Sequence, residues 1–286
     1  MHAADDRRRS LRAVLCAAAA CALLVACSKQ ESAAPAGAGA SATSPARVLI
    51  VGTDAAYAPF ESQNEKGEIV GFDIDVVKAV AQKAGLEVKF VNTPWEGIFN
   101  ALKQGDRDLL VSSITITDER KQTMDFTAPY FDAHQLIAVR SDSKVARFDD
   151  LKTLKVGVQT GTTGDEAISR LQGKTSANIK RFESTPLALS ELGTGGIDAV
   201  VADNGVVVNY VRNNGGSKFR TVNDPAFRPE QYGIAVRKGN AELLEKLDKG
   251  LAAIRADGSY DRIYARYLGA PPSAGGASAP AAAASK

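Results

Sequence analysis

The sequence predicts an α/β protein made of two lobes of about a hundred residues each. Buried strands alternate with helical segments in two successive series, the first starting near residue 47 and the second near residue 135. A late strand and two amphipathic helices follow the second series. With 286 residues and 44% hydrophobic side chains, the chain is long enough to bury two modest cores.

The N-terminus is typical of a segment that is removed after export. Four arginines between residues 7 and 12 precede the apolar run 13–26, which is too short to span a membrane but typical of a signal peptide. The run ends in Leu-Val-Ala-Cys, with the cysteine at Cys27, and this resembles a bacterial lipobox. The resemblance implies a lipoprotein signal peptide over residues 1–26 and attachment of a lipid to Cys27. A plain secretory signal is the alternative.

Two segments of biased composition flank the part that is expected to fold. Residues 27–46 and 270–286 are rich in Ala, Ser, Gly and Pro, which predicts a flexible tether and a disordered tail. Loss of residues 1–26 lowers the Lys and Arg count from 35 to 31 and the Asp and Glu count from 33 to 31. The remaining chain is nearly neutral, so we expect no nucleic-acid partner. Cys27 would be its single cysteine, which excludes a disulfide within one chain.

The first series places polar and aromatic side chains just after a buried strand. The strand predicted over Arg47–Val51 leads into a loop that contains Asp54 and Tyr57. Open α/β sheets bind ligands beyond the carboxyl ends of their strands, so both side chains are candidates for a ligand site. The alternative interpretation is a capping Asp and a packed Tyr.

Two helices and a strand continue the first series. We expect a helix from Gly71 to Gly85, a strand over Leu86–Val91 and a helix over Trp95–Leu102. Trp95, the only tryptophan, begins the second helix directly after a strand. It is either part of the core or an apolar wall of a ligand site.

The stretch Ser112–Arg120 has the features of a carboxylate site. It follows a short buried strand, and Thr117 is typical of a helix N-cap. Free N–H groups, small hydroxyls and the planar guanidinium of Arg120 can together bind an anion. In the alternative interpretation, Arg120 pairs with Asp118 or Glu119 on a solvated helix end.

The second series contains another candidate for anion binding. The strand predicted over Lys155–Gln159 runs into the Gly- and Thr-rich loop Thr160–Asp165, which would expose N–H groups before a helix. The loop lacks the Gly-Lys-Ser/Thr ending of a nucleotide-binding P-loop, so a carboxylate is favoured. The strand predicted over Ile197–Ala202 ends at Asp203, which takes the place of Arg120 in the first series with the opposite charge. Asp203 can bind a cation, cap the next helix, or do both.

The remaining predicted elements complete the two series. They are strands over residues 135–139 and 177–182, helices starting at Thr185 and over 204–212, a late strand over 231–236, and helices over 241–256 and 260–268. The sequence does not indicate which lobe the last two helices cover.

Several motifs, taken together, resemble one protein family. They are Gly52-Thr53-Asp54 with Tyr57 and Pro59-Phe60, Gly71-Phe72-Asp73, Trp95-Glu96-Gly97, the run Thr115 to Arg120, the run Phe126 to Tyr130, and the run Gln231 to Ala235. Through them, residues 47–269 are similar to the polar amino-acid-binding proteins of bacterial ABC importers, solute-binding protein family 3.

The resemblance implies a type II periplasmic-binding-protein fold. In that fold, residues 47–130 and 232–269 would form lobe 1, residues 135–228 would form lobe 2, and two hinge strands would join them. A ligand held by both lobes would then favour the closed arrangement over the open one.

The resemblance also implies roles for the candidate residues. Arg120 would bind the α-carboxylate of an amino acid, helped by Ser113, Thr115 and the backbone of Thr162, and Asp203 would bind the α-amino group. The side chain of the ligand would lie among Asp54, Tyr57, Trp95 and Gln159. With their neighbours, the candidate ligand-binding residues are Asp54, Tyr57, Trp95, Ser112, Ser113, Thr115, Arg120, Gln159, Thr162, Thr163 and Asp203.

The expected ligand is a polar amino acid with a basic side chain. Glutamine binders of the family tend to have Lys at the position of Gln159 and His at that of Ala202, so the chain departs from their pattern. Asp54 and the aromatic rings of Tyr57 and Trp95 suit a cation. We therefore expect arginine, lysine, ornithine or histidine, with glutamine, glutamate or another neutral polar amino acid as the alternative. No cofactor or metal is implied.

Two other classes of protein share this fold. Periplasmic cyclohexadienyl dehydratases are enzymes that would need an acidic carboxyl group beside the substrate. Sensor domains are normally followed by a membrane-spanning segment, and residues 270–286 contain no such run. We expect no catalytic residues and no enzyme activity. We expect a monomeric periplasmic lipoprotein, anchored to a membrane through Cys27, that delivers its amino acid to an ABC permease in the inner membrane.

Overall fold

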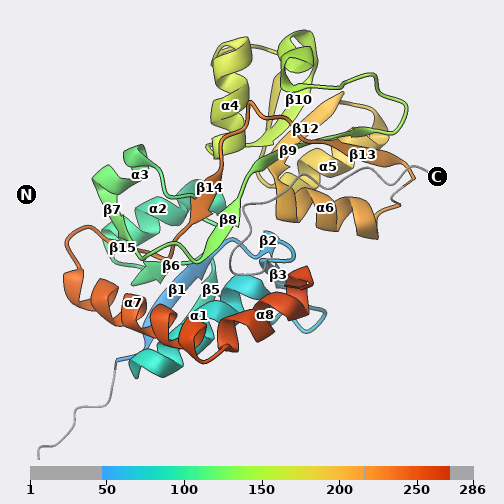
Figure 1. Ribbon diagram of the computed structural model, residues 1–286. Coiled ribbons are helices and arrows are strands. Elements are labelled where there is room, and N and C mark those ends of the chain that lie inside the picture. The colour runs from blue at the N-terminus through green and yellow to red at the C-terminus, as the bar shows by residue number, and fades with distance from the viewer. Residues whose placement is uncertain (1–46, 216, 271–286) are drawn as a thin grey trace, which may run out of the picture. The chain divides into compact units, whose positions relative to one another are not determined.

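Two five-stranded sheets form the centres of two lobes (Figure 1). The computed structural model describes residues 47–215 and 217–270, and these belong to one compact unit. The predicted signal peptide, the lipidation site Cys27, the tether 27–46 and residues 271–286 of the predicted tail lie outside the described residues.

The sheet of the first lobe has the strand order β5-β1-β6-β15-β7. Its strands are β1 (Leu49–Thr53), β5 (Val88–Asn92), β6 (Leu109–Leu110), β7 (Met124–Phe126) and β15 (Ala235–Arg237). β1 runs parallel to β5 and β6, whereas β15 is antiparallel to β6 and β7. The carboxyl ends of β1 and β6 therefore lie at the same edge of the sheet, where ligands bind in open α/β sheets.

Helices cover both faces of this sheet. They are α1 (Phe72–Ala84), α2 (Trp95–Gln104), α3 (Asp118–Thr123), α7 (Ala241–Ala256) and α8 (Ser259–Leu268). Leu109 packs in the cluster that contains α1, α7 and α8, whereas its neighbour Leu110 packs with α2. Successive strand residues point to opposite faces, so α2 covers the face opposite α1, α7 and α8. The last two helices thus belong to the first lobe.

The second lobe repeats this plan. Its sheet has the order β11-β10-β12-β9-β13, formed by β9 (Gln135–Arg140), β10 (Val156–Gln159), β11 (Ile179–Phe182), β12 (Ala199–Asp203) and β13 (Phe219–Val222). One face packs against α4 (Thr163–Gln172) and the 3-10 helix η1 (Phe148–Thr153). The other packs against α5 (Thr185–Thr194) and α6 (Asn204–Asn213).

Two paired strands connect the lobes. β8 (Phe131–Ala133) and β14 (Glu230–Tyr232) run antiparallel, and Figure 1 shows them between the two sheets. A separate small sheet contains β2 (Ala56–Tyr57), β3 (Glu61–Gln63) and β4 (Ile69–Val70).

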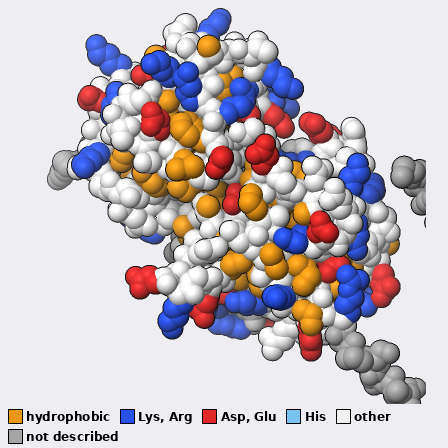
Figure 2. All heavy atoms as spheres, turned by 180° about the vertical axis from the view of Figure 1, so that it is seen from behind, with side chains coloured by type: hydrophobic (Ala, Val, Ile, Leu, Met, Phe, Trp, Pro, Cys, Tyr) orange, Lys and Arg blue, Asp and Glu red, His pale blue; other side chains and the backbone are white. Residues whose placement is uncertain are grey.

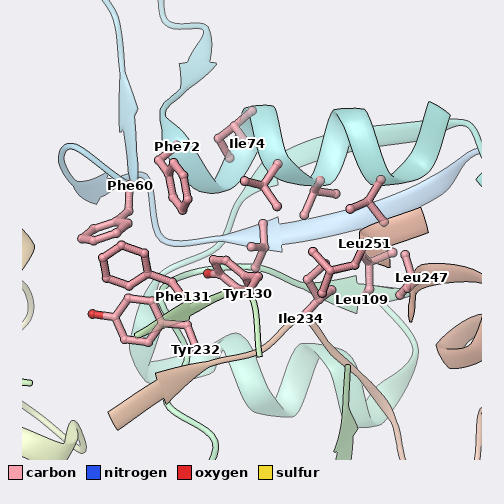
Figure 3. Packing of buried hydrophobic residues seen from close by; sticks show 14 of the residues in the cluster. Phe60, Phe72, Ile74, Leu109, Tyr130, Phe131, Tyr232, Ile234, Leu247 and Leu251 are labelled. Carbon is pink, nitrogen blue, oxygen red and sulfur yellow. The ribbon is translucent and has the colours of Figure 1, made fainter. Parts of the chain in front are cut away.

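The connecting strands are anchored in the aromatic end of the first-lobe core. Figure 3 shows Phe60, Phe72, Phe131 and Tyr232 gathered at one end of the cluster. The ring of Phe131 in β8 stacks on that of Tyr232 in β14 with centroids 5.3 Å apart, and Phe60 meets both edge-on at 5.0 and 5.5 Å. Each such ring pair contributes about 0.5–1.5 kcal/mol beyond its burial. The end of each crossing that lies next to the first lobe is therefore held firmly by its core.

The predicted α/β fold with two lobes and two hinge strands is confirmed, but the prediction of a single late strand is wrong. Instead of one strand over residues 231–236, the chain forms β14 and β15, separated at Gly233. A Cβ on Gly233 would lie 2.9 Å from Ile116 Cδ1 and 3.1 Å from Phe126 Cδ1, so a larger residue at this bend would have to displace these side chains. The chain thus leaves the hinge before it joins the sheet.

The surface of the described residues is mixed in character. On the face shown in Figure 2, Lys and Arg side chains are interspersed with Asp and Glu. Among residues 47–215 and 217–270, no helix combines the length and the apolar character needed to cross a membrane.

Candidate functional site

One cavity brings together all the residues singled out from the sequence. It is lined by Asp54, Tyr57, Trp95, Ser112, Ser113, Thr115, Arg120, Gln159, Thr162, Thr163 and Asp203. The first seven belong to the first lobe and the last four to the second, so the cavity lies between the lobes. It contains about 330 Å³ of space not filled by atoms, part of which is open to solvent. The roles of these residues toward a ligand stay predictions.

Arg120 is fixed at the cavity rather than on a solvated helix end. Its Nη1 donates to the carbonyl oxygen of Thr115 at 2.9 Å and its Nη2 to that of Gly161, across the cavity, at 3.4 Å. The guanidinium carbon lies 5.4 Å from the ring centroid of Trp95 and 5.2 Å from that of Phe99. In the described residues it forms no ion pair with Asp118 or Glu119, and Asp118 pairs with Lys121 instead. Burial lowers the pKa of Arg120, although nearby carboxylates oppose this.

Asp203 faces the first lobe instead of capping α6. Its side chain makes no capping hydrogen bond to that helix. Oδ2 accepts hydrogen bonds from the hydroxyls of Tyr57 at 2.8 Å and Tyr232 at 2.7 Å, and Oδ1 accepts one from Gln135 Nε2. Burial raises the pKa of Asp203, while these donors and the charge of Arg120 oppose the rise. Asp203 is thus a buried acid surrounded by donors from both lobes.

Asp54, on the first-lobe side of the cavity, is a second acidic side chain, and it is partly buried. Its side chain accepts a hydrogen bond from the backbone of Trp95 and another from Gln159 Nε2 in the second lobe at 3.1 Å. The carbonyl oxygen of Glu183 also holds that amide at 3.0 Å. Burial raises the pKa of Asp54, and the hydrogen bond from Gln159 partly offsets this. Among the described residues, Asp54 has no cationic side chain within ion-pair distance.

The Thr-rich loop forms the N-terminus of α4 at the cavity. Thr162 is the N-cap, and its hydroxyl accepts a hydrogen bond from the N–H of Asp165 at 3.2 Å. The same hydroxyl donates to the carbonyl oxygen of Gln159 at 2.8 Å. The positive end of this ten-residue helix therefore faces the space between the lobes, where it favours an anion.

Three residues near the cavity were not singled out from the sequence. Glu230 on β14 accepts hydrogen bonds from the hydroxyls of Thr115 at 2.8 Å and Thr163 at 2.9 Å, which come from opposite lobes. Burial is the main reason why the pKa of Glu230 is raised, followed by the charge of Asp203. Gln135 and Tyr232 complete the shell around Asp203. All three lie on the hinge-side strands β9 and β14, and no strand-end motif marks them.

Metal binding finds no support in the described part of the chain. Within residues 47–215 and 217–270, no group of three or more His, Cys, Asp or Glu side chains could hold a metal ion. The cavity offers one guanidinium, several hydroxyls and a few carboxylates, which suit a small charged organic molecule.

Comparison with known proteins identifies the family. The model of "Bacterial extracellular solute-binding proteins, family 3" matches residues 49–270. The chain belongs to this family. The resemblance drawn from its motifs is therefore confirmed, as is the type II periplasmic-binding-protein fold.

Three relatives are particularly similar. A "Probable histidine-binding protein" of Neisseria gonorrhoeae is 44% identical over 259 residues, which cover 89% of this chain and 94% of the relative. "ABC transporter arginine-binding protein 1" of Escherichia coli is 36% identical, with coverage of 79% and 91%. A crystal structure of the arginine-, lysine-, histidine-binding protein ArtJ from Geobacillus stearothermophilus has a TM-score of 0.76 and 44% identity, covering 79% of this chain and 97% of that chain. Each alignment covers most of this chain and most of the relative.

Proposed function

We propose that this protein captures a free L-amino acid with a cationic side chain between its two lobes and delivers it to an ABC permease of the inner membrane. Lipid on Cys27 would anchor it on the periplasmic side of a membrane, and the protein would act as a monomer without a cofactor. Arginine, lysine, ornithine and histidine are the expected ligands.

The observation that carries this proposal is the extra carboxylate at Asp54. A zwitterion presents one carboxylate and one ammonium group, and Arg120 and Asp203 provide one partner for each from opposite lobes. Asp54 then remains in the same cavity with hydrogen bonds from neutral groups and, among the described residues, no cationic partner. A partly buried carboxylate without a cationic partner is unfavourable, and a ligand side chain with a positive charge would provide that partner.

The names of the relatives support the same ligand class. The two relatives known by sequence are named for binding histidine and arginine, and the solved structure for binding arginine, lysine and histidine. Glutamine or another neutral polar amino acid is the alternative, because the amide of Gln159 already gives Asp54 one hydrogen bond.

Asp54→Asn tests the proposal. Removal of the charge leaves the shape of the cavity, so we expect the affinity for arginine, measured by calorimetry, to fall by about 30-fold or more, equivalent to about 2 kcal/mol. The affinity for glutamine, if it binds, should change little. Asp118→Asn on the exposed start of α3 is the matched control and should bind arginine as the wild type does. Equal losses for arginine and glutamine would contradict a cation-binding role for Asp54.

An enzyme of the dehydratase kind is the competing class. Burial raises the pKa of both Asp54 and Glu230, and a general acid needs a carboxyl group of this kind. The relatives reported above are named as binding proteins, which favours capture over catalysis. Incubation of the purified protein with prephenate or arogenate should leave both unchanged; formation of an aromatic product would favour the enzyme.

A further inference from the structure

Two acidic side chains, Glu61 and Asp73, lie fully buried beside the residues of the cavity wall. Glu61 belongs to β3 and Asp73 to the first turn of α1, and their carboxyl groups are within hydrogen-bonding reach of each other. Glu61 Oε2 and Asp73 Oδ1 are buried and have no hydrogen-bond donor. In the described residues neither carboxyl group forms an ion pair with Lys or Arg.

Two ionised carboxylates are unfavourable in this arrangement. Burial disfavours each charge, and mutual repulsion disfavours the pair. One proton shared by the two carboxyl groups would leave a single negative charge on the pair. Carboxyl pairs that interact this strongly take up and release protons as a unit.

The surrounding donors indicate which carboxyl group keeps the proton. Asp73 Oδ2 accepts short hydrogen bonds from the hydroxyl of Tyr130 at 2.6 Å and from the backbone N–H of Ser113 at 2.7 Å. Glu61 accepts one, from the hydroxyl of Ser112 at 2.9 Å. Donors stabilise the ionised form, so the negative charge belongs mainly to Asp73 and the proton to Glu61.

The same hydrogen bonds reach three residues that line the cavity. The hydroxyl of Ser112, which donates to Glu61, accepts the backbone N–H of Asp54 at 3.0 Å. Ser113 has a φ of 48°, in the left-handed region that is unfavourable for a residue other than glycine. Its N–H is held in that conformation by Asp73. The acid pair therefore fixes the corner of the cavity where the carboxylate of a ligand is expected.

We propose that Glu61 and Asp73 are positioning residues that share one proton at neutral pH and, in that state, hold Asp54, Ser112 and Ser113 in the geometry that binds the ligand. The positioning role rests on the proposed function, whereas the shared proton does not depend on it.

Other titratable groups around the pair fit this assignment. Burial, followed by the charge of Asp73, raises the pKa of Glu61 well above its ordinary value of 4.5, and Asp54 adds to the rise. The groups that face the pair from other elements are Asp54, Tyr57, Tyr130 and Tyr260. The pKa of each of these tyrosines is itself raised, so they remain neutral donors near neutral pH. No cation among these groups offsets a second negative charge.

The stability of the ligand-free protein tests the shared proton. An unfolded chain loses the proton of Glu61 near pH 4.5, whereas the folded protein keeps it to higher pH, so wild-type stability falls as the pH rises through this window. Glu61→Gln carries a permanent N–H donor and lacks this slope. The ratio of the wild-type to the variant unfolding constant should rise by up to about tenfold per pH unit. Glu65→Gln, an exposed acid of the same hairpin, is the control. Identical pH profiles for wild type and Glu61→Gln would overturn the shared proton.

Ligand affinity tests the positioning role. Glu61→Ala leaves Ser112 without its acceptor, so we expect the affinity for arginine to fall by about tenfold, while Glu61→Gln restores most of it by supplying the same acceptor and donor. Unchanged affinity in Glu61→Ala, or an equal loss in both variants, would overturn the positioning role. If no amino acid binds the wild type, the proposed function fails, and the pH profiles still decide whether the proton is shared.

Discussion

At the scale of single residues, Arg120 owes its place to contacts that other cations cannot reproduce. The carbonyl oxygen of Thr115 accepts a hydrogen bond from one of its terminal nitrogens, and the guanidinium carbon lies over the rings of Trp95 and Phe99. A side chain fixed in this way loses little further conformational entropy when a carboxylate arrives. A lysine ammonium group is a compact point charge and lacks both the planar fork and the flat stacking surface.

Substitution of Arg120 should therefore weaken binding even when the charge is kept. We expect Arg120→Ala to lower the affinity for arginine by about 2–5 kcal/mol, the range for removal of one partner of a buried charge pair. Arg120→Lys should recover only part of this loss. Lys121→Ala, at the next and more exposed cation, should have no effect on calorimetric affinity. Wild-type affinity in Arg120→Ala would contradict its role with the carboxylate.

The residues of the cavity could be predicted where a strand-end pattern marks them. Asp54, Gln159 and Asp203 each lie at or just after the end of a buried strand, and the pocket contains all of them. Glu230 carries no such mark, because it lies on a hinge strand and reaches the cavity only when the lobes are placed together. The sequence also gives no sign of Glu61, because its burial depends on the packing of a three-residue strand.

At the scale of elements, α6 of the second lobe packs directly on the first lobe. Val206 of α6 belongs to the first-lobe core cluster, and Asn209 donates to the carbonyl oxygen of Ala58 at 3.3 Å. A Cβ on Gly205 would lie 2.6 Å from Cε2 and Cζ of Phe60. The absence of a side chain at Gly205 thus lets helix and loop approach closely.

Gly205→Ala should hinder closure of the lobes without touching the ligand. The added methyl group has to displace Phe60 or move α6 away, at the 1–3 kcal/mol that overpacking typically costs, so we expect the affinity for arginine to fall by about tenfold. Small-angle scattering should show a smaller ligand-induced decrease in the radius of gyration. Gly97→Ala is the control, because a Cβ there meets nothing within 4 Å. Wild-type affinity and scattering in Gly205→Ala would contradict this account.

The long elements could be predicted from the sequence, and so could the short buried strand β6, but several of the other short strands could not. The helix Ala241–Ala256 has the predicted limits, and α1 ends at Gly85 as expected. β2, β4 and β8 contain two or three residues, too few for an alternating pattern to emerge. The break between β14 and β15 includes Gly233, where an added Cβ would crowd Ile116 and Phe126.

At the scale of the whole molecule, the charged groups of the cavity are divided between two bodies. Arg120 and Asp54 belong to the first lobe and Asp203 to the second, and in this structure Tyr57 and Gln159 bridge the lobes by bonding the acids directly. We expect a ligand to replace these hydrogen bonds with stronger contacts between charged groups. It can shift the equilibrium between open and closed forms only by as much as its affinities for the two forms differ. The lobe contacts and the ligand thus act on the same equilibrium.

The predicted lipid anchor concerns the attachment of the whole protein rather than its binding site. Cys27 lies outside the described residues, and the predicted tether 27–46 separates it from the first strand at Leu49. If the lipobox is used, labelled fatty acid should be incorporated into the wild type but not into Cys27→Ser, because the thiol is the acceptor. Cys21→Ser lies in the segment predicted to be removed and should label normally.

A variant without Cys27 should lose membrane anchoring but keep ligand binding. A variant that starts at Ser28 behind a plain secretory signal should move from the detergent phase to the aqueous phase, because the contribution of about 0.8 kcal/mol for each buried methylene is lost. Its affinity for arginine should equal that of the wild type, since the cavity is formed by residues from Asp54 onward. Fatty-acid labelling of Cys27→Ser would contradict lipid attachment at Cys27, and a wild type that partitions into the aqueous phase would leave a plain secreted protein.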